Sequence, residues 1–151
     1  DFAAKQLLLI SKNWNIYDPM NAHFSPDGTQ IVFMGQATAN GKWDIYLWEI
    51  GSSMQPLNLT YGDKCRDEDP KFSPDGKSIC FKQTVNGGVG NIKVMDLNGH
   101  VTNTVTNNTV ESGMPYFLAS GTALIYARGE GNTSDIYIVN LSYIFVAEQA
   151  H

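Results

Sequence analysis

The chain has 151 residues, enough for one ordinary domain, and it carries a net charge of −5 with only 10 lysines and arginines. A protein that binds the phosphate backbone of nucleic acids needs a basic face, so this composition argues against a nucleic-acid partner. The longest apolar run, QLLLI at 6–10, is too short to cross a membrane, so no membrane span is expected.

β-strands are the predicted elements along the whole chain. The first, KQLLLIS at 5–11, stands apart from the others. A four-stranded unit follows, whose strands are short runs rich in β-branched and aromatic residues. One strand ends at Phe24, and the next three are TQIVFMG, DIYLWEI and PLNLT. No segment shows the period of a capped amphipathic helix, so we predict an all-β fold.

The same pattern then occurs twice more. FSPDG stands at Phe24–Gly28 and at Phe72–Gly76, and a degenerate copy, FLASG, stands at Phe117–Gly121. A second block follows each copy at a similar offset and reads WDIYLWEI, GNIKVMDL and SDIYIVNL in turn. Each unit is therefore predicted to be a four-stranded antiparallel meander, and the apolar tail at 143–146 is the expected fourth strand of the last. The predicted units are 14–62, 63–108 and 109–151.

The repeated FSPDG motif has a structural interpretation. Ser25-Pro26-Asp27-Gly28 suits a type I β-turn, because proline presets φ at the second position and glycine accepts a left-handed conformation at the fourth. The motif is therefore expected to form the hairpin between the first two strands of each unit. Phe24 and Phe72, which end the first strands, are expected to point into the core.

Four strands per unit and a period of 44–48 residues match the blade of a β-propeller. Unit two resembles the TolB-like propeller repeat, which is also related to WD-type repeats. The matching residues are Pro70, Phe72, Ser73, Pro74, Asp75, Gly76, Lys77, Ile79, Phe81, Ile92, Met95, Asp96, Leu97 and Gly99. The resemblance covers almost the whole chain and implies a single propeller domain or partial propeller over 1–151.

Three blades cannot close a ring, and the resemblance implies a ring of about six. The chain is therefore expected to be part of a larger propeller, one half of a homodimer that joins three blades to three, or an open array. The run at 5–11 fits the outer strand of a blade that precedes unit one or closes the ring.

Acidic residues upstream of the repeated phenylalanine are the candidate site. CRDEDP (Cys65–Pro70) precedes Phe72, and Asp18 and Glu111 occupy equivalent positions in the other units. In a propeller, these segments surround the mouth of the central channel, so their carboxylates could converge on a cation or a basic peptide. They could equally be solvated loop charges or pair with nearby basic residues. The candidate binding residues are Trp14, Tyr17, Asp18, Arg66, Asp67, Glu68, Asp69 and Glu111.

The sequence lacks the common signatures of catalytic and metal-binding sites. The chain has neither a G-x-S-x-G elbow nor an H-E-x-x-H or EF-hand motif, and its three histidines are scattered. No cofactor is predicted, although a cation at the channel mouth is possible. Cys65 and Cys80 lack metal-binding spacing and are expected to be small buried residues, with a disulfide as the alternative.

These observations favour a non-catalytic TolB-like module. We expect it to mediate protein or peptide interactions at the bacterial cell envelope or outside the cell, in a periplasmic or extracellular location. One alternative is the propeller portion of a larger hydrolase or polysaccharide lyase whose catalytic residues lie outside this chain. A second alternative is a carbohydrate-binding surface protein, because Trp14 and Tyr17 could form part of a glycan-binding face.

Overall fold

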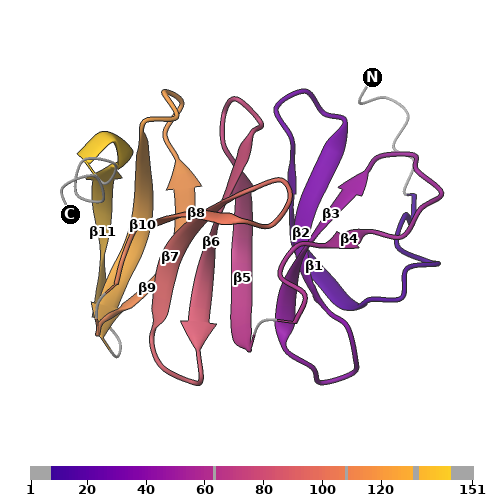
Figure 1. Ribbon diagram of the computed structural model, residues 1–151, viewed down its shortest axis with the longest axis horizontal. Helices are drawn as coiled ribbons and strands as arrows, with labels where there is room; N and C mark the ends of the chain where they lie inside the picture. The colour runs from indigo at the N-terminus through magenta and orange to yellow at the C-terminus, as the bar shows by residue number, and fades with distance from the viewer. Residues whose placement is uncertain (1–7, 63, 108, 131–132, 144–151) are drawn as a thin grey trace.

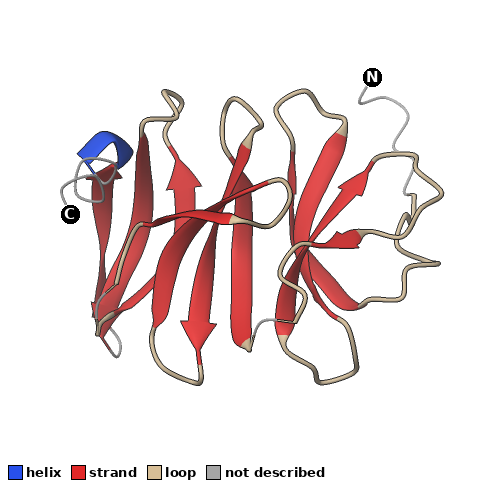
Figure 2. Cartoon of the chain, viewed as in Figure 1, coloured by secondary structure: helices blue, strands red, loops and turns tan. Residues whose placement is uncertain are grey.

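The computed structural model describes residues 8–62, 64–107, 109–130 and 133–143. Three antiparallel sheets stand side by side along the long axis of the molecule (Figure 1). Within the described residues the only helical segment is the short 3₁₀ turn η1 (Leu141–Tyr143), and strands dominate the cartoon (Figure 2). The all-β prediction and the partial propeller are therefore confirmed.

The sheets follow the order of the chain. The first contains β1 (Tyr17–Phe24), β2 (Gln30–Gln36), β3 (Trp43–Glu49) and β4 (Leu57–Asn58). The second contains β5 (Cys65–Phe72), β6 (Ser78–Val85), β7 (Gly90–Asp96) and β8 (Val101–Thr104). The third contains β9 (Glu111–Phe117), β10 (Ala123–Glu130) and β11 (Thr133–Asn140). Each is a meander of sequential antiparallel neighbours, as the repeat predicted.

Two predicted strands are not seen as such. The third sheet has three strands, and the expected fourth strand at 143–146 begins with Tyr143 in η1 and otherwise lies outside the described residues. Residues 8–11 form no strand, while the remainder of the segment 5–11 also lies outside the described residues.

The FSPDG turns form as predicted. The Gly28 amide donates to the Ser25 carbonyl over 2.9 Å, and Gly28 has a φ of 72°. The Asp27 carboxylate accepts hydrogen bonds from the Ser25 hydroxyl at 2.6 Å and from the Thr29 amide at 3.0 Å. Unit two repeats this arrangement with Ser73 and its own aspartate and glycine. The serine and aspartate therefore lock the turn, which explains why they accompany the proline and glycine.

Successive turns also contact each other along the upper edge of Figure 1. A Cβ atom added to Gly76 would lie 3.4 Å from Cδ of Pro26, and one added to Gly121 would lie 3.8 Å from Cδ of Pro74. The degenerate motif of unit three retains Gly121 at a φ of 71°. Glycine there satisfies both the left-handed backbone and the proline of the preceding blade.

Two hydrophobic clusters lie between the sheets, and a third, formed by Ile31, Phe33, Tyr46 and Trp48, lies on the other face of the first sheet. The cluster between the first and second sheets includes Met34, Ile45, Leu47, Phe72, Phe81 and Met95. The cluster between the second and third includes Cys80, Ile92, Val94, Phe117, Leu124 and Tyr126. Phe72 and Phe117, which end the first strands of units two and three, therefore each pack against the preceding sheet.

The prediction that Phe24 is buried is wrong. Its side chain is 65% exposed, whereas Phe72 and Phe117 are 4% and 5% exposed. Phe72 is covered by the first sheet, but the described residues place no sheet before β1 to cover Phe24. Within the described residues, the third sheet is likewise uncovered on its outer face. Ile136 of β11 is 75% exposed, while its counterparts Ile45 and Ile92 are fully buried.

Neither cysteine is in a disulfide. Cys65 is partly exposed at the start of β5, and Cys80 is buried on β6, and both are in the thiol form. Burial raises the pKa of Cys80 to about 12, so this thiol stays protonated at neutral pH and serves as an apolar core residue.

Candidate functional site

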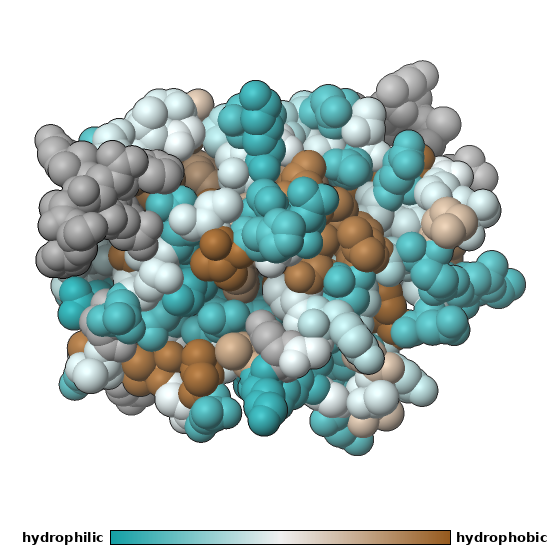
Figure 3. Space-filling view, in the orientation of Figure 1, coloured by the Kyte–Doolittle hydropathy of each residue, from teal (hydrophilic) through white to brown (hydrophobic). Residues whose placement is uncertain are grey.

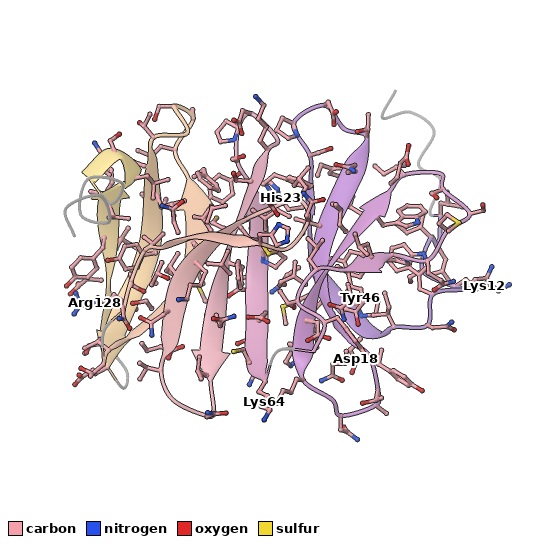
Figure 4. The ribbon with its side chains drawn as sticks, in the orientation of Figure 1. Lys12, Asp18, His23, Tyr46, Lys64 and Arg128 are labelled. Carbon is pink, nitrogen blue, oxygen red and sulfur yellow. The ribbon has the colours of Figure 1, made fainter. Side chains whose placement is uncertain are left out.

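The start of β5, the start of β9 and the loops beside them form a cleft at the lower end of the molecule. Lys64, labelled in Figure 4, lies at this end, opposite the FSPDG turns. The β2–β3 loop of unit one and the β6–β7 hairpin of unit two complete the walls. The cleft has a volume of ≈ 500 Å³, and its charged lining residues are Lys42, Lys64, Arg66, Glu68, Lys82 and Glu111.

An ion-pair network crosses this cleft. The Glu68 carboxylate lies 2.7 Å from the Arg66 guanidinium and 3.4 Å from the Lys82 ammonium. Lys82 also contacts Glu111 at 2.6 Å, and the second oxygen of Glu111 accepts a hydrogen bond from the Gly90 amide at 2.6 Å. Lys82 therefore joins unit two to unit three.

The pKa shifts of Glu111 and Lys82 favour the charged form of both groups. Partial burial would raise the pKa of Glu111, but hydrogen bonds from Lys82 and the Gly90 amide, together with the charges of Lys82 and Arg66, hold it below its ordinary value. Burial would lower the pKa of Lys82, but the hydrogen bond to Glu111 and the charge of Glu68 raise it overall. The Lys82–Glu111 pair is therefore an ion pair at neutral pH.

The other predicted acids do not join this network. Asp67 is fully buried and accepts a hydrogen bond from the Gln83 amide at 3.1 Å. Asp69 accepts one from Asn21 of unit one at 2.7 Å, and Asp18 is exposed on β1. The segments that hold these acids are part of the first strands β1 and β5, and successive strand side chains point to opposite faces. Alternation therefore separates Asp67 from Glu68.

A bulge in each first strand determines which way the side chains before it point. Asn21, Asp69 and Met114, each three residues before the repeated phenylalanine, have φ values of 54°, 56° and 53°. The pairing register shifts at these positions, as it does where an extra residue is inserted into a strand. Asparagine and aspartate tolerate this left-handed conformation and can indicate it in a sequence, whereas the methionine at Met114 does not.

The predicted aromatic residues are separated as well. The Trp14 ring stacks on Phe33 with centroids 4.9 Å apart and meets Trp48 edge-on at 5.1 Å. Trp14 therefore covers the first sheet rather than facing the cleft. Tyr17, at the start of β1, is 52% exposed.

His23 is a contact residue that the sequence did not single out. Its Nδ1 accepts a hydrogen bond from the Phe72 amide of unit two at 3.3 Å, so its proton lies on Nε2, which faces the Tyr116 hydroxyl of unit three at 3.4 Å. The imidazole of unit one thus connects all three first strands in the upper half of Figure 4. Partial burial, and secondarily the charge of Lys71, lower its pKa below the ordinary value.

Acidification is expected to weaken the fold through His23. Because the pKa of His23 is lower in the folded protein than in the unfolded chain, the folded protein binds fewer protons at this residue. Its contribution to stability is therefore present above pH 6.5, the unfolded-state pKa, and is lost as the pH falls through the folded-state pKa. Thermal melting between pH 8 and pH 5 should show a larger fall in Tm for the wild type than for His23→Gln. Parallel curves for the two proteins would assign the pH response to other groups.

The described residues show neither a metal centre nor a membrane-spanning helix. They contain no group of three or more histidine, cysteine or acidic side chains placed to hold a metal ion. Nor do they contain a helix long and apolar enough to span a membrane.

Curated proteins similar to this chain are longer than it. An uncharacterised peptidase of Bacillus subtilis, YuxL, is 24% identical over 140 residues, which cover 87% of this chain and 20% of the peptidase. An uncharacterised protein of Agrobacterium fabrum is 26% identical over 112 residues, which cover 74% of this chain and 36% of that protein. The chain thus spans between a fifth and about a third of these relatives. No family model matches it.

Solved structures with the same arrangement include two described as TolB. A putative TolB from Agrobacterium tumefaciens aligns with a TM-score of 0.69 at 21% identity, covering 82% of this chain and 47% of that one. TolB from Acinetobacter baumannii aligns with a TM-score of 0.65 at 26% identity, covering 81% of this chain and 30% of that one.

Two enzymes share the arrangement at lower similarity. A puromycin hydrolase aligns with a TM-score of 0.62 at 16% identity, over 81% of this chain and 20% of the enzyme. An oligogalacturonate lyase aligns with a TM-score of 0.58 at 21% identity, over 80% of this chain and 36% of the enzyme. The repeated FSPDG hairpins, the three meanders and these likenesses agree, and the chain has the fold of a TolB-like β-propeller.

Proposed function

We propose that this chain is a non-catalytic TolB-like propeller module that binds a protein or peptide partner at the bacterial cell envelope or outside the cell. The observation that carries the proposal is the cleft at the lower end, where charged side chains from units two and three and a loop of unit one gather around an open volume. The network of Glu68, Lys82 and Glu111 holds two units in a fixed relation, so the cleft is preorganised. The periplasmic or extracellular location rests on the TolB-like likeness.

Panning a random-peptide library against the immobilised protein tests this function. We expect recovered peptides to compete with one another and to lose at least about tenfold in affinity for Thr84→Tyr, because the uncharged tyrosine would fill part of the cleft that Thr84 lines. Thr122→Tyr, on the turn at the opposite end of the molecule, is the matched control and should bind like the wild type. Recovery of no binding peptide, or equal affinity of both variants, would contradict a peptide site in this cleft.

A second candidate is favoured by the comparisons. The similarity to a Bacillus subtilis peptidase and to a puromycin hydrolase supports a propeller that belongs to a larger hydrolase, and the lyase similarity supports the equivalent role beside a lyase. In that case the catalytic residues lie outside these 151 residues. The coding sequence on both sides of this chain distinguishes the two, because this candidate requires an adjoining catalytic domain and peptidase, esterase or lyase activity in the full-length protein.

A further inference from the structure

The cleft at the lower end has an excess of positive charge in a protein that is negative overall. Among the described residues, four of the chain's ten basic residues line it, against two acids, whereas the whole chain carries −5. The basic residues are Lys42, Lys64, Arg66 and Lys82, and the acids are Glu68 and Glu111. This concentration is opposite in sign to the cation site that the acidic segments suggested.

The two acidic side chains of the cleft already have ion-pair and hydrogen-bond partners within the chain. Glu68 is held between Arg66 and Lys82, and Glu111 receives Lys82 and the Gly90 amide. A cation entering the cleft would have to displace these bonds and would meet the unshared charge of the remaining lysines. The network therefore disfavours a cation or a basic peptide.

Lys42 and Lys64 supply the unshared charge. Among the described residues, neither has a carboxylate within the 4.0 Å that defines an ion pair. The Lys42 ammonium donates to the Lys64 carbonyl, which fixes the β2–β3 loop of unit one beside the start of β5. The Lys64 side chain is exposed, and Arg66 is 55% exposed and bonds Glu68 through one terminal nitrogen, so guanidinium donors remain for a ligand.

We infer that this cleft binds the carboxylate groups of an acidic peptide segment, an inference that rests on the proposed peptide-binding function and specifies its partner. The carboxylates pair with Lys42, Lys64 and Arg66, while Gly87 and Gly88 of the β6–β7 hairpin allow close approach of the peptide backbone. Trp43 is the only aromatic residue in the described lining and is partly buried, so the cleft offers charge rather than the apolar faces that a chain of sugar rings would cover.

Fluorescence anisotropy with labelled peptides tests this inference. A glutamate-rich decapeptide is compared with the same sequence carrying glutamine and with one carrying lysine. We expect the acidic peptide to bind at least about tenfold more tightly than the glutamine peptide, and to weaken further when salt is raised from about 50 to 300 mM. The double variant Lys42→Gln/Lys64→Gln should lose about tenfold in affinity, whereas Lys12→Gln/Lys77→Gln, which removes two exposed lysines outside the cleft, should lose less than about twofold.

The outcomes separate this inference from the proposed function. Equal binding of the glutamate and glutamine peptides, or an unchanged affinity in the Lys42/Lys64 double variant, overturns the acidic specificity. So does tighter binding of an acidic oligosaccharide supplied at the same carboxylate concentration. If library peptides without acidic residues still compete at the cleft, the peptide-binding function stands and the acidic partner fails. If no peptide of any charge binds, both fail.

Discussion

Gly99→Ala is expected to lower the free energy of unfolding by about 2–5 kcal/mol. Gly99 has a φ of 86°, and a left-handed conformation costs a residue with a Cβ about 1–2 kcal/mol. An added Cβ would also lie 2.1 Å from the Leu59 carbonyl oxygen of the preceding blade. This oxygen belongs to the backbone and cannot rotate away, so the two blades must separate locally, at a further cost of about 1–3 kcal/mol. Urea denaturation measures the total.

Gly51→Ala is the matched control. Gly51 follows the third strand of unit one much as Gly99 follows that of unit two, and its φ of 85° is nearly the same, but nothing lies within 4 Å of an added Cβ. This variant should lose only the conformational part, about 1–2 kcal/mol. Equal losses for the two variants would show that the contact between Gly99 and Leu59 does not hold the blades together.

Phe72→Ala is expected to cost about 3–5 kcal/mol, the range for truncating a buried phenylalanine. The side chain is 4% exposed and packs between the first and second sheets with Val32, Leu47 and Met95, so alanine would leave a cavity at the blade interface. Thermal and urea unfolding should both report the loss, and His23, whose ring lies beside Phe72, should become more accessible to solvent.

Phe24→Ala, in the same five-residue motif, is the comparison. Phe24 is 65% exposed, and we expect a loss below about 1 kcal/mol because most of its surface is already in water. A loss as large as that of Phe72→Ala would show that Phe24 is covered in solution, either by another part of the protein or by a second copy.

The repeat was the part of the fold that the sequence determined best. Pro26 has a fixed φ and Gly28 accepts the left-handed conformation that the turn needs, so the hairpin and the strands on either side could be placed without the structure. Burial was harder to predict, because it depends on neighbours rather than on the motif. Phe24 and Phe72 begin the same five residues, FSPDG, yet only Phe72 has a preceding sheet among the described residues to cover it.

The candidate site was predicted only in part, and the bulge at Asp69 explains why. From the pairing of Phe72 with Ile79, a regular hairpin would set Glu68 opposite Gln83. The inserted residue instead sets Glu68 opposite Lys82, and this pairing creates the ion-pair network. A left-handed aspartate inside a strand has no reliable sequence signal, so Lys82 was not identified and the sign of the cleft's charge was not anticipated.

The second sheet has a neighbouring sheet on each of its two faces (Figure 1). Apolar patches remain at the molecular surface among hydrophilic groups (Figure 3). In a linear array of units, the free energy needed to unfold one unit is the sum of its intrinsic stability and the stabilities of the interfaces that it shares with its neighbours. Transient opening of the first or third unit breaks one interface between units, whereas opening of the second unit breaks two. Amide hydrogens of β6 and β7 should therefore be the slowest in the chain to exchange with solvent, and local fluctuations should begin at the two outer sheets.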